Sequence, residues 1–151
     1  MSVDALEQLA GRCAGLAADG TDPQVLAVLL AWTVRPRRSF ESLRRRVLEE
    51  GRGWDVVDPR APGTAGGVGA RLAARIRPEV DAADVVAAAS IVQRWLRRGC
   101  RLAVVGDPAY PSRLAEGWPS TDGPVLLAST GTLPDAPACV ALVGARRASA
   151  Y

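Results

Sequence analysis

The feature that most constrains the fold of this chain is a change in apolar periodicity about two thirds of the way along it. Before that change, apolar residues recur at spacings of three and four, as they do over 6–16, which is typical of amphipathic helices. After it they form short, nearly continuous runs at 102–105, 124–128 and 139–143. Runs that are apolar on both faces are typical of buried strands in a parallel sheet that helices cover. We therefore expect an all-helical unit that leads into an α/β domain.

Capping residues predict where the helices begin and end. The helix through 6–16 is expected to end near Asp19-Gly20. The next begins at Asp22-Pro23, a good N-cap followed by Pro at the first helical position, and a third has Ser39 as its cap with Ser42 at N3. Beyond a Gly-rich connector, helices are expected over 69–76 and from about 79 to 98, with Gly99 as the C-terminal stop.

These elements predict two domains, a helical one over 1–98 and the beginning of a Rossmann-like parallel-sheet domain over 99–151. A doubly wound sheet needs at least four or five strands with crossover helices, and only three candidate strands are present. We therefore expect the second domain to be incomplete, and its strands to expose an apolar face and an open edge.

Composition excludes several kinds of chemistry. The chain has no His, so a His-based catalytic triad and the usual zinc ligand are absent, and we expect no catalytic residue, metal or cofactor. The three cysteines are widely spaced, and we interpret them as small buried hydrophobic residues. Apolar runs stop at about ten residues where a bilayer needs roughly 20, and the N-terminus lacks the basic region of a signal peptide, so a cytoplasmic location without membrane contact is expected.

Charge is distributed unevenly along the chain. Residues 35–52 and 71–101 each carry seven Arg and a net charge of +4. We interpret the runs at 44–46 and 94–98 as solvated helix faces rather than phosphate contacts. Trp32 and Trp95 fall within helical apolar patterns and are expected in the core, whereas the loop residues Trp54 and Trp118 remain open as stacking platforms.

The segment 143–151 has the ingredients of a phosphate-binding turn. Gly144 lets the backbone turn sharply, Arg146 offers a planar five-donor fork, and Ser149 adds a hydroxyl near the start of an expected helix. Since only the first Gly is present, the segment is not the fingerprint of a dinucleotide site. A strand end with two solvated arginines is the alternative for this segment taken alone.

Three ordered motifs support the phosphate-binding interpretation. The D-x-x-Y-P-x-x-L turn at 107–114, the P-x-x-L strand at 124–127 and the V-G-x-R-x-x-S-x-Y segment at 143–151 resemble the DNA-processing protein A family, the recombination mediators of bacterial natural transformation. The resemblance covers about 94–151, and over 1–93 only the layout of a small helical domain matches. Tyr110, beside Pro111, is interpreted as a structural turn anchor.

The resemblance implies a sterile-alpha-motif-like helical domain and an extended Rossmann-like domain that binds single-stranded DNA, loads a RecA-type recombinase and forms a homodimer. Gly144, Arg146 and Ser149 match the family's phosphate-binding turn, and Tyr151 matches the aromatic that closes it. Ala145 departs from the Ser often found there, and Ala145, Arg147 and Tyr151 are candidates for additional DNA contacts. Later strands of the family, with the surfaces for the recombinase and the dimer, have no counterpart in these residues.

Three alternatives remain open at this stage. The Gly67-Val68-Gly69 pattern is that of a helix-hairpin-helix turn, although a plain loop-to-helix junction explains it as well. The chain is alternatively a fragment of a Rossmann-type nucleotide-handling enzyme resembling a nucleoside phosphoribohydrolase, although the acidic P-G-G-x-G-T-x-x-E stretch of such enzymes is not found. A third alternative is that the helical unit serves as a protein-interaction module.

Overall fold

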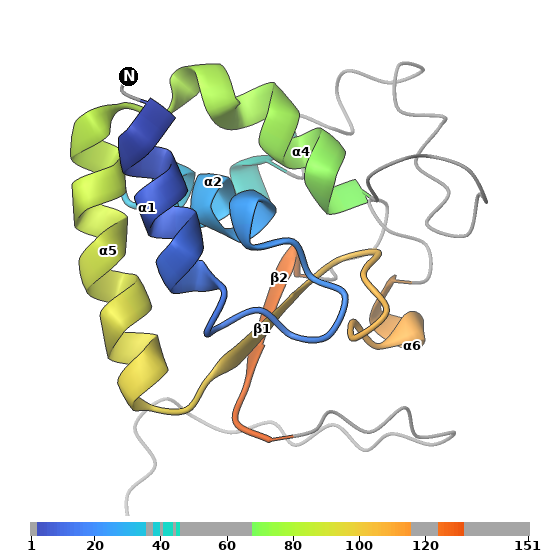
Figure 1. The fold of residues 1–151 in the computed structure, drawn as a ribbon. Coiled ribbons are helices and arrows are strands. Elements are labelled where there is room, and N and C mark those ends of the chain that lie inside the picture. Colours follow the sequence, from blue (N-terminus) through green and yellow to red (C-terminus); the bar gives the residue numbers. More distant parts are fainter. Residues whose placement is uncertain are drawn as a thin grey trace, which may run out of the picture.

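The computed structural model describes residues 3–35, 38–39, 41–43, 45, 68–115 and 124–131. This part of the chain is a mixed α/β structure that is mostly helical (Figure 1). The elements, in chain order, are α1 (Val3–Cys13), α2 (Pro23–Thr33), α4 (Val68–Ile76), the 3₁₀ helix η2 (Arg77–Glu79), α5 (Ala82–Arg97), β1 (Arg101–Val104), α6 (Ser112–Ala115) and β2 (Leu126–Ser129). Residues 41–43 and 45 are also helical.

Local capping contacts begin the helices where the sequence predicts. The side chain of Asp22 accepts a hydrogen bond from Gln24 N at 2.8 Å, with Pro at the start of α2. Ser39 and Ser42 exchange reciprocal bonds between side chain and backbone N–H, which confirms the predicted cap of the third helix. Each such cap stabilises a helix start by about 1 kcal/mol.

The long helix α5 starts at Ala82, three residues later than predicted. Pro78 lies in the 3₁₀ turn η2, and Asp81 is the N-cap of α5, in a capping box with Asp84. At the other end, Gly99 has φ +64, the left-handed conformation in which glycine ends a helix without a Cβ clash. The predicted C-terminal stop is therefore confirmed.

The first helix ends at Cys13, before the predicted stop near Asp19-Gly20. Leu16 continues the apolar spacing and is fully buried, but it lies in a turn after the helix, and its carbonyl is bonded to β1. Leu102 N donates to Leu16 O at 2.7 Å and Ala18 N donates to Leu102 O at 2.9 Å. The segment after α1 is thus bonded to β1, and this competing partner ends the helix early.

The two strands pair antiparallel, with Arg101 opposite Ser129 and Val104 opposite Leu126. The parallel pairing predicted for successive strands is therefore wrong for this pair. A parallel pair needs a crossover that returns the chain to the end of the sheet where the first strand began. Here Val105 N, just after β1, donates to Val125 O, just before β2, at 2.9 Å, so the second strand begins where the first one ends and runs back along it. The parallel neighbour of β1 is instead Ala17, bridged to Leu102. The predicted strand over 139–143 lies outside the described residues.

One hydrophobic cluster extends across the predicted domain boundary at residues 98 and 99. Leu102, Val104 and Val105 are fully buried together with residues of α1, α2, α4 and α5. The expectation that the strands expose an apolar face is therefore wrong for β1, because the helices cover it. In β2, by contrast, Leu126 and Leu127 are only half-buried. No helix in the described ranges is long and apolar enough to cross a membrane.

Candidate nucleic-acid interface

The residues predicted to contact DNA phosphate, Gly144, Arg146 and Ser149, lie outside the described residues, as do Ala145, Arg147 and Tyr151. The structure therefore describes two of the three motifs that carry the resemblance. These are the turn that begins at Asp107 and the strand that follows Pro124.

The turn after β1 is organised by Asp107. Its Oδ2 accepts hydrogen bonds from Val104 N at 3.1 Å and from the Thr21 hydroxyl at 2.7 Å, and the latter joins the turn to the loop before α2. Burial raises the pKa of the Asp107 carboxyl, while these two hydrogen bonds act to lower it and the nearby Asp22 raises it. The role of Asp107 is to hold the turn after β1 against the helical unit.

Tyr110 anchors the same turn to the second strand. Its side chain is 4% exposed, and its hydroxyl donates to the Pro124 carbonyl at 2.5 Å. Burial raises the pKa of the phenol to about 12, so it stays a hydrogen-bond donor at neutral pH. The predicted structural role of Tyr110 is confirmed, and its hydrogen bond connects two of the motifs on which the resemblance rests.

The most strongly basic stretch of the described chain is the C-terminal end of α5. Arg94, Arg97 and Arg98 are exposed, as predicted for a solvated helix face, and Arg101 follows at the start of β1. None of Arg94, Arg97 and Arg98 forms an ion pair with another described residue. Three guanidinium groups within five residues therefore remain available to an anion.

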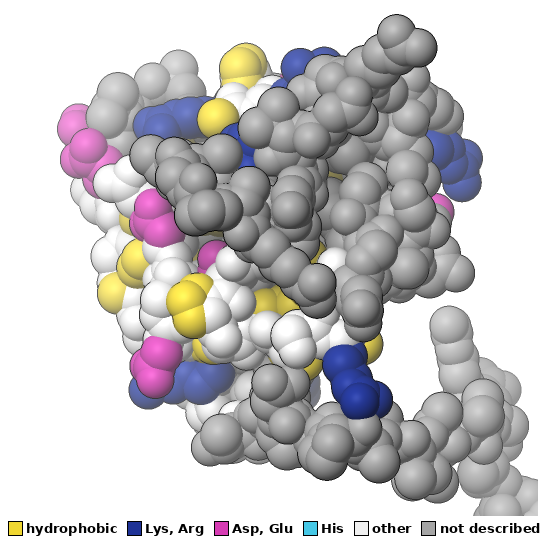
Figure 2. All heavy atoms as spheres, turned by 90° about the vertical axis from the view of Figure 1, so that its right-hand side faces the viewer, with side chains coloured by type: hydrophobic (Ala, Val, Ile, Leu, Met, Phe, Trp, Pro, Cys, Tyr) yellow, Lys and Arg dark blue, Asp and Glu magenta, His cyan; other side chains and the backbone are white. Residues whose placement is uncertain are grey.

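The end of α1 adds a further cation on the same side. Arg12 lies in its last turn, and a Cβ added to Gly15 just beyond it would lie 2.8 Å from Leu96 Cδ2 of α5. Figure 1 shows that α1 and α5 run in the same direction and end at the same side of the molecule. On the face that carries α4 and α6, Figure 2 shows dark blue side chains standing apart from one another.

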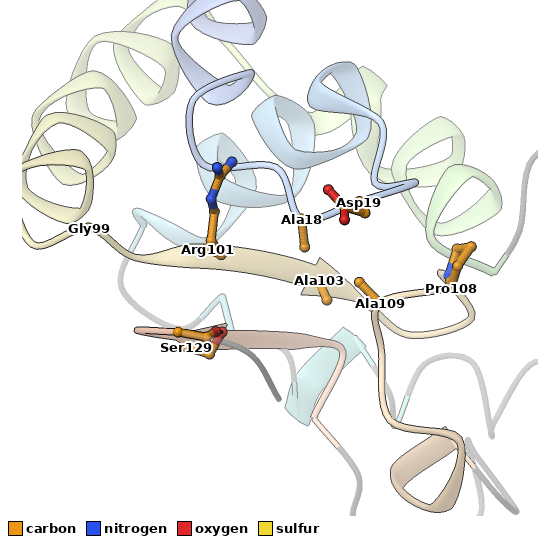
Figure 3. Close-up of a pocket in the computed structure, with 9 residues that line it drawn as sticks. Ala18, Asp19, Gly99, Arg101, Ala103, Pro108, Ala109 and Ser129 are labelled. Carbon is orange, nitrogen blue, oxygen red and sulfur yellow. The ribbon is translucent and has the colours of Figure 1, made fainter. Parts of the chain in front are cut away.

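A hollow of about 610 Å³ opens beside this basic end. Figure 3 shows that its lining comes from the loop after α1, from β1 with its following turn, and from β2. Arg101, Asp19 and Ser129 supply polar groups, and Ala18, Ala103 and Ala109 contribute small apolar ones. Arg101 Nη1 donates to the Ala17 carbonyl at 3.1 Å, which holds the guanidinium in place and leaves its other N–H groups available.

The sequence did not predict this hollow, because its polar side chains come from three segments far apart in the chain. The one local signal is the position of Arg101, which directly follows the Gly99-Cys100 stop of α5 and begins a buried strand. Arg101 is a charged residue directly before the apolar run 102–105, and this position indicates a polar environment at that end of the strand.

Not every arginine in the two basic blocks is available. Near the end of α2, Arg35 forms ion pairs with Asp81 and Asp84, and Arg38 forms them with Glu79 and Asp84. These pairs attach the C-terminal end of α2 to the N-terminal end of α5. Their contribution is structural, a role that the charge count alone does not predict.

Trp32 belongs to the same network. It is 2% exposed, its Nε1 donates to Glu79 Oε2 at 3.0 Å, and the Arg38 guanidinium lies 5.8 Å from its ring centroid. The predicted core position of Trp32 is thus confirmed, and Trp95 is half-buried against the core. Trp54 and Trp118 lie outside the described residues.

The G-h-G pattern at 67–69 has a packing explanation. A Cβ on Gly69 would lie 2.4 Å from Val104 Cγ1, so only glycine lets α4 approach β1 this closely. Val68 and Gly69 are both buried, which favours the plain loop-to-helix junction over a phosphate contact. Cys13 is also buried, and burial raises its pKa to about 12, as expected of an inert core thiol, whereas Cys100 is half-buried.

Comparisons of the chain with protein-family models, with curated proteins and with solved structures find no match.

Proposed function

We propose that this chain is part of a non-enzymatic, cytoplasmic protein that binds single-stranded DNA, as the resemblance to the DNA-processing protein A family implies. In this proposal helices α1, α2, α4 and α5 belong to a sterile-alpha-motif-like domain, and β1, α6 and β2 belong to the beginning of a Rossmann-like one. A RecA-type recombinase and a second copy of the protein are its further proposed partners.

The observation that carries the proposal is the segregation of arginines. Arg35 and Arg38 are neutralised by carboxylates at one end of α5, whereas Arg94, Arg97 and Arg98 have no ion-pair partner in the described part of the chain. Exposed arginines without carboxylate partners attract phosphates without reading sequence, because they neutralise backbone charge and release counterions. The basic end also lies directly before β1, and the turn of the resemblance follows that strand at Asp107.

Fluorescence anisotropy with a labelled oligothymidine tests this proposal. Wild-type protein should bind with an affinity that falls steeply as salt increases. Changing Arg94, Arg97 and Arg98 together to Ala should reduce the salt slope by about 2, since each contact to a single strand contributes about 0.7. The matched control changes the exposed Arg45, Arg77 and Arg113 to Ala, which removes the same charge elsewhere. Equal effects of the two triple variants, or binding that is insensitive to salt, would refute the proposal.

The predicted turn at 144–146 is tested separately. Arg146→Ala should weaken binding by about 1.5–3 kcal/mol, the typical value of a charge-assisted hydrogen bond, whereas Arg45→Ala on an exposed helix face should have little effect. Equal affinities of the two single variants would exclude Arg146 as a phosphate ligand.

A further inference from the structure

The hollow beside Arg101 differs chemically from the arginine surface next to it. Three exposed arginines form that surface, whereas the hollow combines one guanidinium with one carboxylate, Asp19, and with the Ser129 hydroxyl. Asp19 is exposed and makes no ion pair with any residue that the structure describes. A phosphate inside the hollow would meet this carboxylate, so an anion is disfavoured there while it is favoured on the surface outside.

A neutral group with both donors and acceptors suits the hollow better. Arg101 can donate through the N–H groups that Ala17 leaves available, and Asp19 can accept. The Ser129 hydroxyl donates to Gly131 O at 3.1 Å, so its lone pairs remain to accept. Ala18, Ala103 and Ala109 also line the hollow, and their small side chains leave its volume open (Figure 3). A volume of about 610 Å³ is within the range of small-molecule pockets, roughly 300–1,000 Å³.

We propose that the hollow between Asp19 and Arg101 accommodates a nucleobase of a single strand whose phosphates lie on Arg94, Arg97 and Arg98. This inference rests on the proposed function and adds to it the reason for single-strand preference. In a duplex every base is stacked and paired, so a base enters the hollow only after it leaves the helix, at an energetic cost. A single strand places a base there without that cost.

The test compares two labelled probes of equal length and charge, an oligothymidine and a strand of abasic residues. Both carry the same phosphates, so the ratio of their affinities reports the bases alone. Wild-type protein should bind oligothymidine about tenfold more tightly, the size expected when one hydrogen bond between the base and a charged side chain is lost. Ala18→Leu, which fills the hollow, and Asp19→Ala, which removes the acceptor without filling it, should each bring the ratio close to one.

Glu7→Ala is the matched control for Asp19→Ala, because it removes one exposed carboxylate from α1 away from the hollow, and it should keep the wild-type ratio. Asp19→Ala lies in an exposed loop and keeps the proposal testable if Ala18→Leu fails to fold. The base site is overturned if Asp19→Ala keeps the affinity ratio of the wild type. It is also overturned if the wild-type protein itself binds the two probes equally, and in both cases phosphate binding remains intact. Failure to bind either probe would instead refute the proposed function. Competition by free thymidine monophosphate at the concentration of the strand would show a mononucleotide site and overturn the strand proposal.

Discussion

The two ends of helix α5 use the same residue type in opposite ways. At its N-terminal end, Arg35 and Arg38 reach Asp81, Asp84 and Glu79, and four ion pairs attach α2 to α5. At its C-terminal end, Arg94, Arg97 and Arg98 are exposed and make no ion pair with other described residues. The comparison teaches that the charge of a segment does not reveal what its arginines do.

Burial explains the difference between the two ends. The Asp84 side chain is 3% exposed, so its carboxylate needs compensating partners, and it obtains them from two guanidinium groups and the Asp81 backbone N–H. At the C-terminal end no described carboxylate requires a cation. The helix macrodipole itself favours positive charge there, since its C-terminal end is partially negative.

Removing Asp84 should have the largest effect on stability. Asp84→Ala deletes a capping-box member and leaves Arg35 and Arg38 without their common partner, so unfolding free energy should fall by about 3 kcal/mol. Because both arginines are partly exposed, water recovers some of that loss. Urea denaturation measures it, with the more exposed Asp81→Ala as the matched control, expected to cost about 1 kcal/mol. Equal losses would show that burial of Asp84 is unimportant.

Trp32→Phe should have the next largest effect, at the same end of α5. It removes the Nε1 donor to Glu79 and the larger ring below Arg38, and it should lower the unfolding free energy by about 2 kcal/mol. Thermal unfolding followed by circular dichroism provides the measurement. If the variant is as stable as the wild type, the network near Glu79 contributes little.

The arginines at the C-terminal end should matter least for stability. Changing Arg94, Arg97 and Arg98 together to Ala should cost less than about 1 kcal/mol, since only the interaction with the helix macrodipole is lost. The same variant should show the reduced salt slope in DNA binding. A large loss of unfolding free energy, measured by urea denaturation, would show that these three arginines stabilise the fold as Arg35 and Arg38 do.

Asp107 is half-buried, whereas Asp84 is buried, and it has hydrogen bonds but no ion pair with a described cation. Its pKa is raised in the folded state, so the folded protein holds this proton more tightly than the unfolded chain does. The contribution of Asp107 to stability therefore decreases as pH rises through the raised pKa.

Asp107→Asn keeps an oxygen that can accept from Thr21 and Val104 and removes the buried charge. The variant should be at least as stable as the wild type at pH 7, and the difference should narrow as the pH falls toward 4. Urea denaturation at several pH values measures it. A difference that instead widens on acidification would contradict the raised pKa.

Much of the local structure was predictable, whereas the candidate site was only partly so. Asp22, Ser39 with Ser42, and Gly99 act through contacts within a few residues, so their roles follow from the sequence itself. Tyr110 was identified as an anchor from its neighbours, but its partner Pro124 is 14 residues away. The hollow is lined by Asp19, Arg101 and Ser129, which come from three separate segments. No local sequence pattern predicts that these three residues line one hollow.

The sequence by itself determined the order of helices and strands and most of the helix starts, because these depend on apolar periodicity and on caps. Tertiary contacts determine that β1 and β2 run antiparallel, that the segment after Cys13 bonds to β1 instead of continuing α1, and which arginines are neutralised. The aspartate partners of Arg35 and Arg38 lie 46 to 49 residues away along the chain. Such pairs form because packing α2 against α5 brings the charges together. The position of a charge in the sequence does not predict which charges will meet in this way.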